Sequence, residues 1–146
     1  MARPQKDLTP YTGCNCDQAI GLDPLAVGFV SRKYQFETGP VPTKFLQKLL
    51  PFCHPSKTVC QVPRAQNSAL GGKQIEVDIQ GEKVMLGAAE IRVIGNEDIF
   101  AAPDLIYHYV ADHNYLPPDE FIEAVMSGPS PDSAEFKALI NTLRTF

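Results

Sequence analysis

Two helices separated by a pair of prolines constrain this chain more than any other feature of its sequence. Pro103 fits the first position of a helix, and apolar side chains follow it at helical spacing. Asn114 is expected to stop this helix in a left-handed conformation, and the prolines at 117–118 prevent its continuation. The same prolines suit the start of a second helix. Residues 103–114 and 118–127 are therefore expected to form a helical hairpin that buries its apolar faces against the rest of the chain.

Residues 73–101 are expected to supply the sheet that receives this hairpin. Apolar and polar side chains alternate over residues 75–79, which is typical of a half-buried strand. Gln-Gly at 80–81 suits a two-residue turn, and that turn places Val84 opposite Val77 on the apolar face. The polar face of such a sheet is expected to remain in water.

Further elements complete the prediction of an α+β fold. Apolar side chains occupy even-numbered positions just before Gly87, such as Val84 and Leu86, and odd-numbered positions after it, such as Ile91 and Val93. This change indicates a bulge or bend before the strands that end at Ala101. We expect a three- to four-stranded antiparallel β-meander that is packed on one face by about four helices. These helices are predicted at 42–50, 103–114, 118–127 and 131–144. The chain is expected to form one domain over 1–146, with residues 1–40 as a loop-rich N-terminal arm that contains one short helix after Pro24.

Composition excludes several classes of protein. The chain has 146 residues, of which 44% are hydrophobic and 21% are charged, as in ordinary globular proteins. A net charge of -4 does not suit nucleic-acid binding, which usually requires a basic face. The start of the chain lacks the apolar core of a secretory signal, and the longest apolar run is too short to span a bilayer. We therefore expect a soluble, cytoplasmic protein that binds neither nucleic acid nor membrane.

Three polar side chains of the first hairpin helix are candidates for a functional surface. His108 and Asp112 are four residues apart, so they are neighbours on a helix, and a carboxylate at this spacing can orient an imidazole. The pair could act as a general base or as two metal ligands. The alternative is a partly exposed surface pair without chemistry, because no nucleophile or third ligand is identifiable by spacing. Tyr107 points away from the apolar stripe and is a surface candidate.

The cysteines are the most specific chemical feature. In the expected cytoplasmic compartment, four cysteines are thiols or metal ligands before they are disulfides. Cys14 and Cys16 are separated by one residue, and a disulfide between them is badly strained. Together with Cys53, His54 and Cys60 they offer enough ligands for a tetrahedral zinc site. The alternative is that these cysteines are buried and inert.

Three segments resemble a family of small, uncharacterised bacterial proteins. They are Tyr-Gln-Phe-Glu-Thr-Gly-Pro-Val at 34–41, Ala-Glu-Ile-Arg-Val at 89–93 and the long segment at 100–122. The family signature is Tyr-Ala-Ala-Pro-x-Leu-Ile-x-His-Tyr-Val-x-x-His-x-Tyr-x-Pro-Pro-x-Glu-Phe. Many members carry a His-x-Cys-x-x-Cys element ahead of the second segment, where this chain has only Cys60. The resemblance implies a shared domain and no particular reaction.

These observations lead to two hypotheses about function. The first is a non-enzymatic protein-interaction module that binds an unknown protein partner, with no catalytic residue and no cofactor. The alternative is a small zinc-binding protein or an enzyme that uses Cys14, Cys16 and Cys60, or His108 and Asp112. The two hypotheses differ in whether the three cysteines meet in space.

Overall fold

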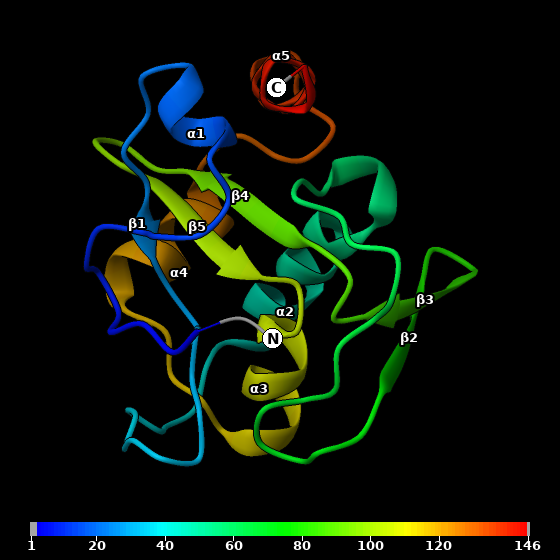
Figure 1. Cartoon of the computed structure of the whole chain (residues 1–146). Helices are drawn as coiled ribbons and strands as arrows, with labels where there is room; N and C mark the ends of the chain where they lie inside the picture. Colours follow the sequence, from blue (N-terminus) through cyan, green and yellow to red (C-terminus); the bar gives the residue numbers. More distant parts are fainter. Residues whose placement is uncertain (1–2, 146) are drawn as a thin grey trace.

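Five strands form two separate sheets in the computed structural model, which describes residues 3–145 (Figure 1). In the first sheet, β5 (Ile99–Pro103) lies between β1 (Leu25–Ala26), its parallel neighbour, and β4 (Glu90–Ile94), its antiparallel neighbour. The second sheet pairs β2 (Ile75–Ile79) with β3 (Glu82–Leu86) in antiparallel orientation. The α+β class is confirmed, but the strands do not form one continuous meander.

Five α-helices surround the first sheet, and short 3-10 turns follow α2. The elements are α1 (Cys16–Ala19), α2 (Thr43–Leu49), η1 (Leu50–Cys53), η2 (Pro55–Lys57), α3 (Ile106–His113), α4 (Asp119–Ser127) and α5 (Ala134–Arg144). The predictions at 42–50 and 118–127 agree with α2 and α4. The helix predicted at 103–114 begins later, because Pro103 is the last residue of β5.

The last helix also begins later than the predicted 131–144. Ser133 caps α5, since its Oγ accepts a hydrogen bond of 3.2 Å from the backbone N–H of Phe136. Asn114 ends α3 with a φ of 58°, so the predicted left-handed stop is confirmed. Among residues 3–145, no helix has the length and apolar character needed to cross a bilayer.

The β2–β3 hairpin has the predicted register. Gln80 and Gly81 both have positive φ, as a two-residue hairpin turn of the primed type requires, and Val77 pairs with Val84. Val84 and Leu86 are buried and Val77 is half-buried, so the apolar face of the hairpin is turned inward as expected.

A change of direction at Gly87 separates the two sheets. The backbone N–H of Gly87 donates to Asp104 Oδ1 at 2.8 Å, and its carbonyl accepts from Gln66 at 2.9 Å. The carbonyl of Ala88 accepts from the backbone N–H of Val62. The loop before the β2–β3 hairpin therefore occupies the backbone positions at which β3 would have paired with β4 in a continuous meander. The bend predicted at this glycine is present, and it divides the expected meander.

The N-terminal arm covers the face of the three-stranded sheet on which the side chain of Arg92 lies. Tyr11 N–H donates to the carbonyl of Pro24, and Val27 N–H donates to that of Ala101, which fastens the arm across β1 and β5 (Figure 1). The prediction of a short helix after Pro24 is wrong, because the chain there forms β1. The expectation of a solvated polar face holds for the β2–β3 hairpin, where Glu76 and Asp78 are exposed, but it is wrong for β4, where Arg92 is fully buried.

Candidate functional site

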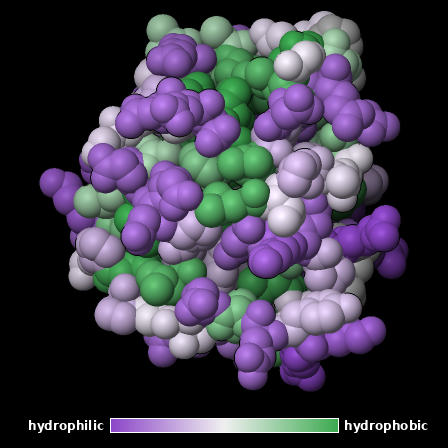
Figure 2. Space-filling model, turned by 90° about the vertical axis from the view of Figure 1, so that its left-hand side faces the viewer, coloured by the Kyte–Doolittle hydropathy of each residue, from purple (hydrophilic) through white to green (hydrophobic). Residues whose placement is uncertain are grey.

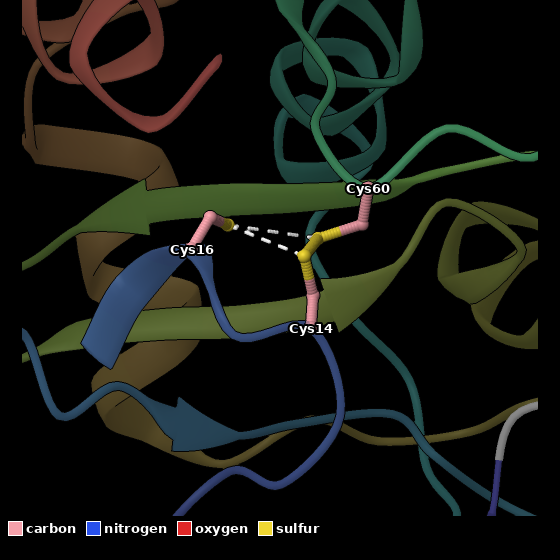
Figure 3. A group of neighbouring side chains, drawn as sticks. All are labelled: Cys14, Cys16 and Cys60. Atoms are coloured by element: carbon pink, nitrogen blue, oxygen red, sulfur yellow. Dashed lines mark hydrogen bonds between the residues drawn. A yellow bond between two sulfur atoms is a disulfide. The ribbon is translucent and has the colours of Figure 1, made fainter. Parts of the chain in front are cut away.

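Three of the four cysteines meet beside β4 (Figure 3). Cys14 lies in the arm just before α1, Cys16 is the first residue of α1, and Cys60 lies in the loop between η2 and β2. Their sulfur atoms all lie within 4.8 Å of one another. Cys14 and Cys60 form a disulfide with a Cα–Cα distance of 6.1 Å, which joins positions 46 residues apart. The structure thus brings together the three cysteines on which the second hypothesis depends.

Cys16 is a free thiol beside this disulfide. Its Sγ lies 3.3 Å from Cys14 Sγ and 3.8 Å from Cys60 Sγ, and the residue is 7% exposed. Burial, followed by the charge of Asp17, raises the pKa of the Cys16 thiol above its usual value. The thiol is therefore protonated at neutral pH unless a cation or a change in its surroundings removes the proton.

A buried arginine forms the wall behind the cysteines. Arg92 donates to both carboxylate oxygens of Asp17, at 3.0 and 2.7 Å, and from Nη1 to Glu90 at 3.0 Å. Its Nη2 also lies 3.8 Å from Cys60 Sγ, and its guanidinium stacks over the ring of Tyr11 at 4.8 Å. Burial lowers the pKa of Arg92, but the hydrogen bond to Asp17 and the charge of Glu90 outweigh burial and raise it. The side chains behind the cysteines therefore comprise one permanent cation, Arg92, and two carboxylates, Asp17 and Glu90.

Sequence reasoning missed this ion-pair network. Glu90 and Arg92 alternate with apolar residues and so belong to the polar face of the sheet, which was expected to remain in water. The pairing of Glu90 with Arg92 is observed, but the main partner is Asp17, which is 75 residues from Arg92 and lies on the covering arm. An arginine between two aliphatic residues, Ile91 and Val93, is the available signal, and it does not identify the partner.

A groove of about 350 Å³ opens beside the cysteines. It is lined by all three of them and by Thr58, Val59, Gln61, Leu143 and Arg144. Small molecules and ions can therefore reach the sulfur atoms from solvent. Sulfur in this arrangement can undergo thiol–disulfide exchange or bind thiophilic cations.

Cys53 and His54 lie elsewhere. The Cys53 thiol is in the core, 3.5 Å from the carbonyl oxygen of Asp104, and burial raises its pKa well above the usual value. His54 contacts Glu82 through Nε2 at 3.0 Å and Ser56 through Nδ1 at 2.7 Å. Neither residue belongs to the three-cysteine group.

His108 and Asp112 form the predicted contact, but His108 is buried. Its Nδ1 lies 2.8 Å from Asp112 Oδ2, and it is 4% exposed, so the expectation of a partly exposed pair is wrong for the histidine. Its Nε2 lies 3.1 Å from Ser68 Oγ and 3.2 Å from His113 Nε2. Tyr107 is half-buried on the same helix and takes no part in these contacts.

Ser68, His108 and Asp112 have the order of a serine nucleophile, base and orienting acid, but the serine hydroxyl is occupied. Its oxygen accepts hydrogen bonds from the backbone N–H groups of Leu70 and Gly71, at 3.2 and 3.1 Å, and Ser68 is 3% exposed. A hydroxyl with both lone pairs engaged and no access to solvent is a poor nucleophile. The contacts instead fasten the 66–72 loop to α3.

Asp104 is a second buried carboxyl group near the cysteines. It lines a cavity of about 200 Å³ together with Cys60, Glu90 and Tyr109. Burial raises its pKa from 3.8 to about 7, although hydrogen bonds from the backbone of Gly87 oppose this effect. Asp104 therefore titrates near neutral pH at the connection between β3 and β4.

A family model described as a domain of unknown function (DUF7919) matches residues 4–126, a segment that includes all three clustered cysteines and Arg92. No curated protein and no solved structure matches the chain. The match confirms the expectation of an uncharacterised family, whereas the long signature and a bacterial origin stay predictions. Because the matched segment covers most of its length, the chain belongs to the DUF7919 family.

Proposed function

We propose that the protein is a thiol-based redox switch in which Cys14 and Cys60 reversibly form a disulfide. The observation that carries the proposal is the cluster itself: a disulfide joins two distant segments at a solvent-accessible groove, with the free thiol of Cys16 beside it. In the reducing cytoplasm that we expect for this chain, disulfides are usually transient and redox-sensing rather than structural.

The closing reaction requires a small-molecule disulfide as oxidant. The thiolate of Cys60 attacks one sulfur of the oxidant and releases its other half as a thiol. The thiolate of Cys14 then attacks the Cys60 sulfur of this mixed disulfide, which releases the second half as a thiol. Two protein thiols are oxidised and one oxidant disulfide is reduced to two thiols. Arg92 Nη2 lies 3.8 Å from Cys60 Sγ and stabilises the Cys60 thiolate. This thiolate attacks the oxidant when the disulfide forms, and it is the leaving group when the disulfide is reduced.

Opening the disulfide changes how firmly the arm is held. The bond closes a loop of 46 residues, and a constraint of this length stabilises a fold by roughly 4 kcal/mol in the chain-entropy description. The ion pair between Asp17 and Arg92 does not depend on the disulfide, and neither do the backbone hydrogen bonds of the arm to β1. We therefore expect the reduced protein to stay folded, with a loosened segment around α1.

A redox titration tests the proposal. The protein is equilibrated with mixtures of reduced and oxidised glutathione or dithiothreitol, its thiols are trapped by alkylation, and the fraction with linked Cys14 and Cys60 is read by mass spectrometry. We expect a two-electron transition above about -300 mV, together with faster hydrogen exchange around α1 in the reduced form. Cys53→Ala is the matched control and should keep the transition, whereas Cys14→Ser should abolish it.

Two outcomes would overturn the switch. A transition below about -300 mV would identify a permanent structural disulfide, and a pair that stays reduced in every mixture would show that no disulfide forms.

The interaction module with an unknown protein partner stays a prediction, as does the cytoplasmic location. Among residues 3–145, the large apolar side chains on the surface are those of Tyr34, Val62 and Met85, which lie in three separate segments. On the face that carries the N-terminal arm, apolar side chains alternate with hydrophilic ones (Figure 2). No specific partner follows from this surface.

A further inference from the structure

We propose that the reduced form of the same centre binds one zinc ion through Cys14, Cys16 and Cys60, with the fourth coordination position open to the groove. This inference rests on the proposed function, because the disulfide must open before Cys14 and Cys60 can act as ligands.

The position of Cys16 favours a ligand over an attacking thiol. A thiolate that attacks a disulfide approaches along the S–S bond, so the three sulfur atoms lie nearly in line. The attacking sulfur is then farther from the leaving sulfur than from the attacked sulfur by about the length of an S–S bond, or about 2 Å. The two distances from Cys16 Sγ are 3.3 and 3.8 Å, so the thiol lies beside the bond (Figure 3). Cys16 is therefore poorly placed for exchange, and the three sulfur atoms form a triangle.

A triangle of sulfur atoms is one face of a tetrahedral zinc site. Zinc binds thiolates at about 2.3 Å, which places tetrahedral sulfur ligands about 3.8 Å apart. Cys16 Sγ and Cys60 Sγ already lie 3.8 Å apart, and Cys16 Sγ and Cys14 Sγ lie 3.3 Å apart. Once the disulfide opens, a small separation of Cys14 from Cys60 completes the face.

The charges behind the cysteines favour a bound cation. Asp17 and Glu90 together carry one more negative charge than Arg92 offsets. Three bare thiolates beside this wall would repel the carboxylates and one another. A dication offsets two of these four negative charges. Arg92 Nη2, 3.8 Å from Cys60 Sγ, gives a coordinating thiolate the outer hydrogen-bond donor that such ligands usually have.

The fourth coordination position is left to an external ligand. No other His, Cys, Asp or Glu among residues 3–145 joins the cluster. The carboxylate of Asp17 lies 3.7 Å from Cys16 Sγ but is held by Arg92 through both oxygens. The groove beside the cysteines can admit a water molecule, as at zinc sites with three protein ligands. Zinc and the disulfide use the same two sulfur atoms, so each state excludes the other.

Metal binding is tested on untagged, full-length protein that has been reduced and freed of reductant under nitrogen. Zinc is titrated in competition with a chromophoric chelator, and cobalt is used separately to detect sulfur-to-metal charge-transfer absorption. We expect one equivalent of zinc in the reduced protein and none in protein oxidised with glutathione disulfide. Cys16→Ser should weaken binding at least 100-fold, whereas Cys53→Ala should bind as the natural protein does.

The variants also separate this inference from the redox switch. Cys16→Ser keeps both cysteines of the disulfide, so its redox transition should be unchanged although its zinc is lost. Reduced protein that binds no zinc, or Cys16→Ser that binds it as tightly as the natural protein, would overturn the zinc site and leave the switch standing. Zinc bound by a protein whose Cys14 and Cys60 never link would support the site and overturn the switch.

Discussion

Arg92 holds Asp17 through two hydrogen bonds, from Nε to Oδ1 at 3.0 Å and from Nη2 to Oδ2 at 2.7 Å, where neither side chain reaches solvent. The contact joins the middle of β4 to the short helix that carries Cys16. It therefore positions one sulfur of the cluster relative to the sheet, whether Cys14 and Cys60 are linked or not.

Removing the cation from this pair should destabilise the protein strongly. Arg92→Met leaves the Asp17 carboxylate buried without its cationic partner, which typically costs about 3–5 kcal/mol. Adding Asp17→Asn to Arg92→Met should recover part of the loss, because the stranded charge is gone. Urea unfolding of both single variants and the double variant measures the coupling. Losses that simply add would show that the two residues do not stabilise each other.

Asp104 should make stability depend on pH. Its pKa is about 7 in the folded protein and 3.8 ordinarily, so the folded state holds the proton more tightly than the unfolded state. This contribution is fully present below about pH 4, and it is lost as the pH rises through about 7, at up to roughly 1.4 kcal/mol per pH unit. Denaturation from pH 4 to 8 should show this decline, and Asp104→Asn, which keeps an acceptor for Gly87, should flatten it. An equally steep decline in the variant would assign the effect to other groups.

Gly87 should tolerate substitution much less than Gly81. Both have positive φ, so alanine is strained at either position. A Cβ at Gly81 meets open space, whereas a Cβ at Gly87 would collide with the backbone carbonyl of Gln66. Gly81→Ala is expected to cost about 1–2 kcal/mol from strain alone, and Gly87→Ala should cost clearly more. Equal midpoints in thermal unfolding would contradict the close packing at the bend.

Asn114 should be replaceable by glycine. Its φ of 58° lies in the left-handed region, and the described contacts give its side chain no hydrogen bond. Asn114→Gly is therefore expected to be neutral or slightly stabilising. Asn114→Ala should lose about 1 kcal/mol, because alanine tolerates the left-handed region less well than asparagine or glycine. Thermal melting of the two variants provides the comparison, and a loss for glycine as large as that for alanine would contradict this explanation.

Local features of the fold were predictable from the sequence because their causes are local. The pairing of Val77 with Val84 follows from strand alternation and a Gln-Gly turn, and the stop at Asn114 follows from the residue type and the prolines beyond it. The two-residue strand β1 has too few residues to produce a pattern. It exists because it pairs with β5, about 75 positions away.

The chemistry of the site was only partly predictable. Residue types identified Cys14, Cys16 and Cys60 as candidate ligands but not the disulfide, which depends on the arm lying across β4. Cys53 and His54 were equally plausible ligands by residue type. In the structure Cys53 lies in the core, whereas His54 contacts Glu82 away from the cluster. Contacts made across the tertiary structure, rather than spacing along the chain, select the three residues that meet.

Mapping the state of each cysteine tests the three-cysteine centre most directly. The protein is oxidised with glutathione disulfide, alkylated without reduction and digested, and the peptides are fragmented between Cys14 and Cys16 in the mass spectrometer. The structure predicts a cross-link from Cys14 to Cys60, an alkyl label on Cys16, and a Cys53 that is labelled only after unfolding. Labels on Cys14 and Cys60 as separate thiols, or a cross-link that involves Cys53, would contradict it.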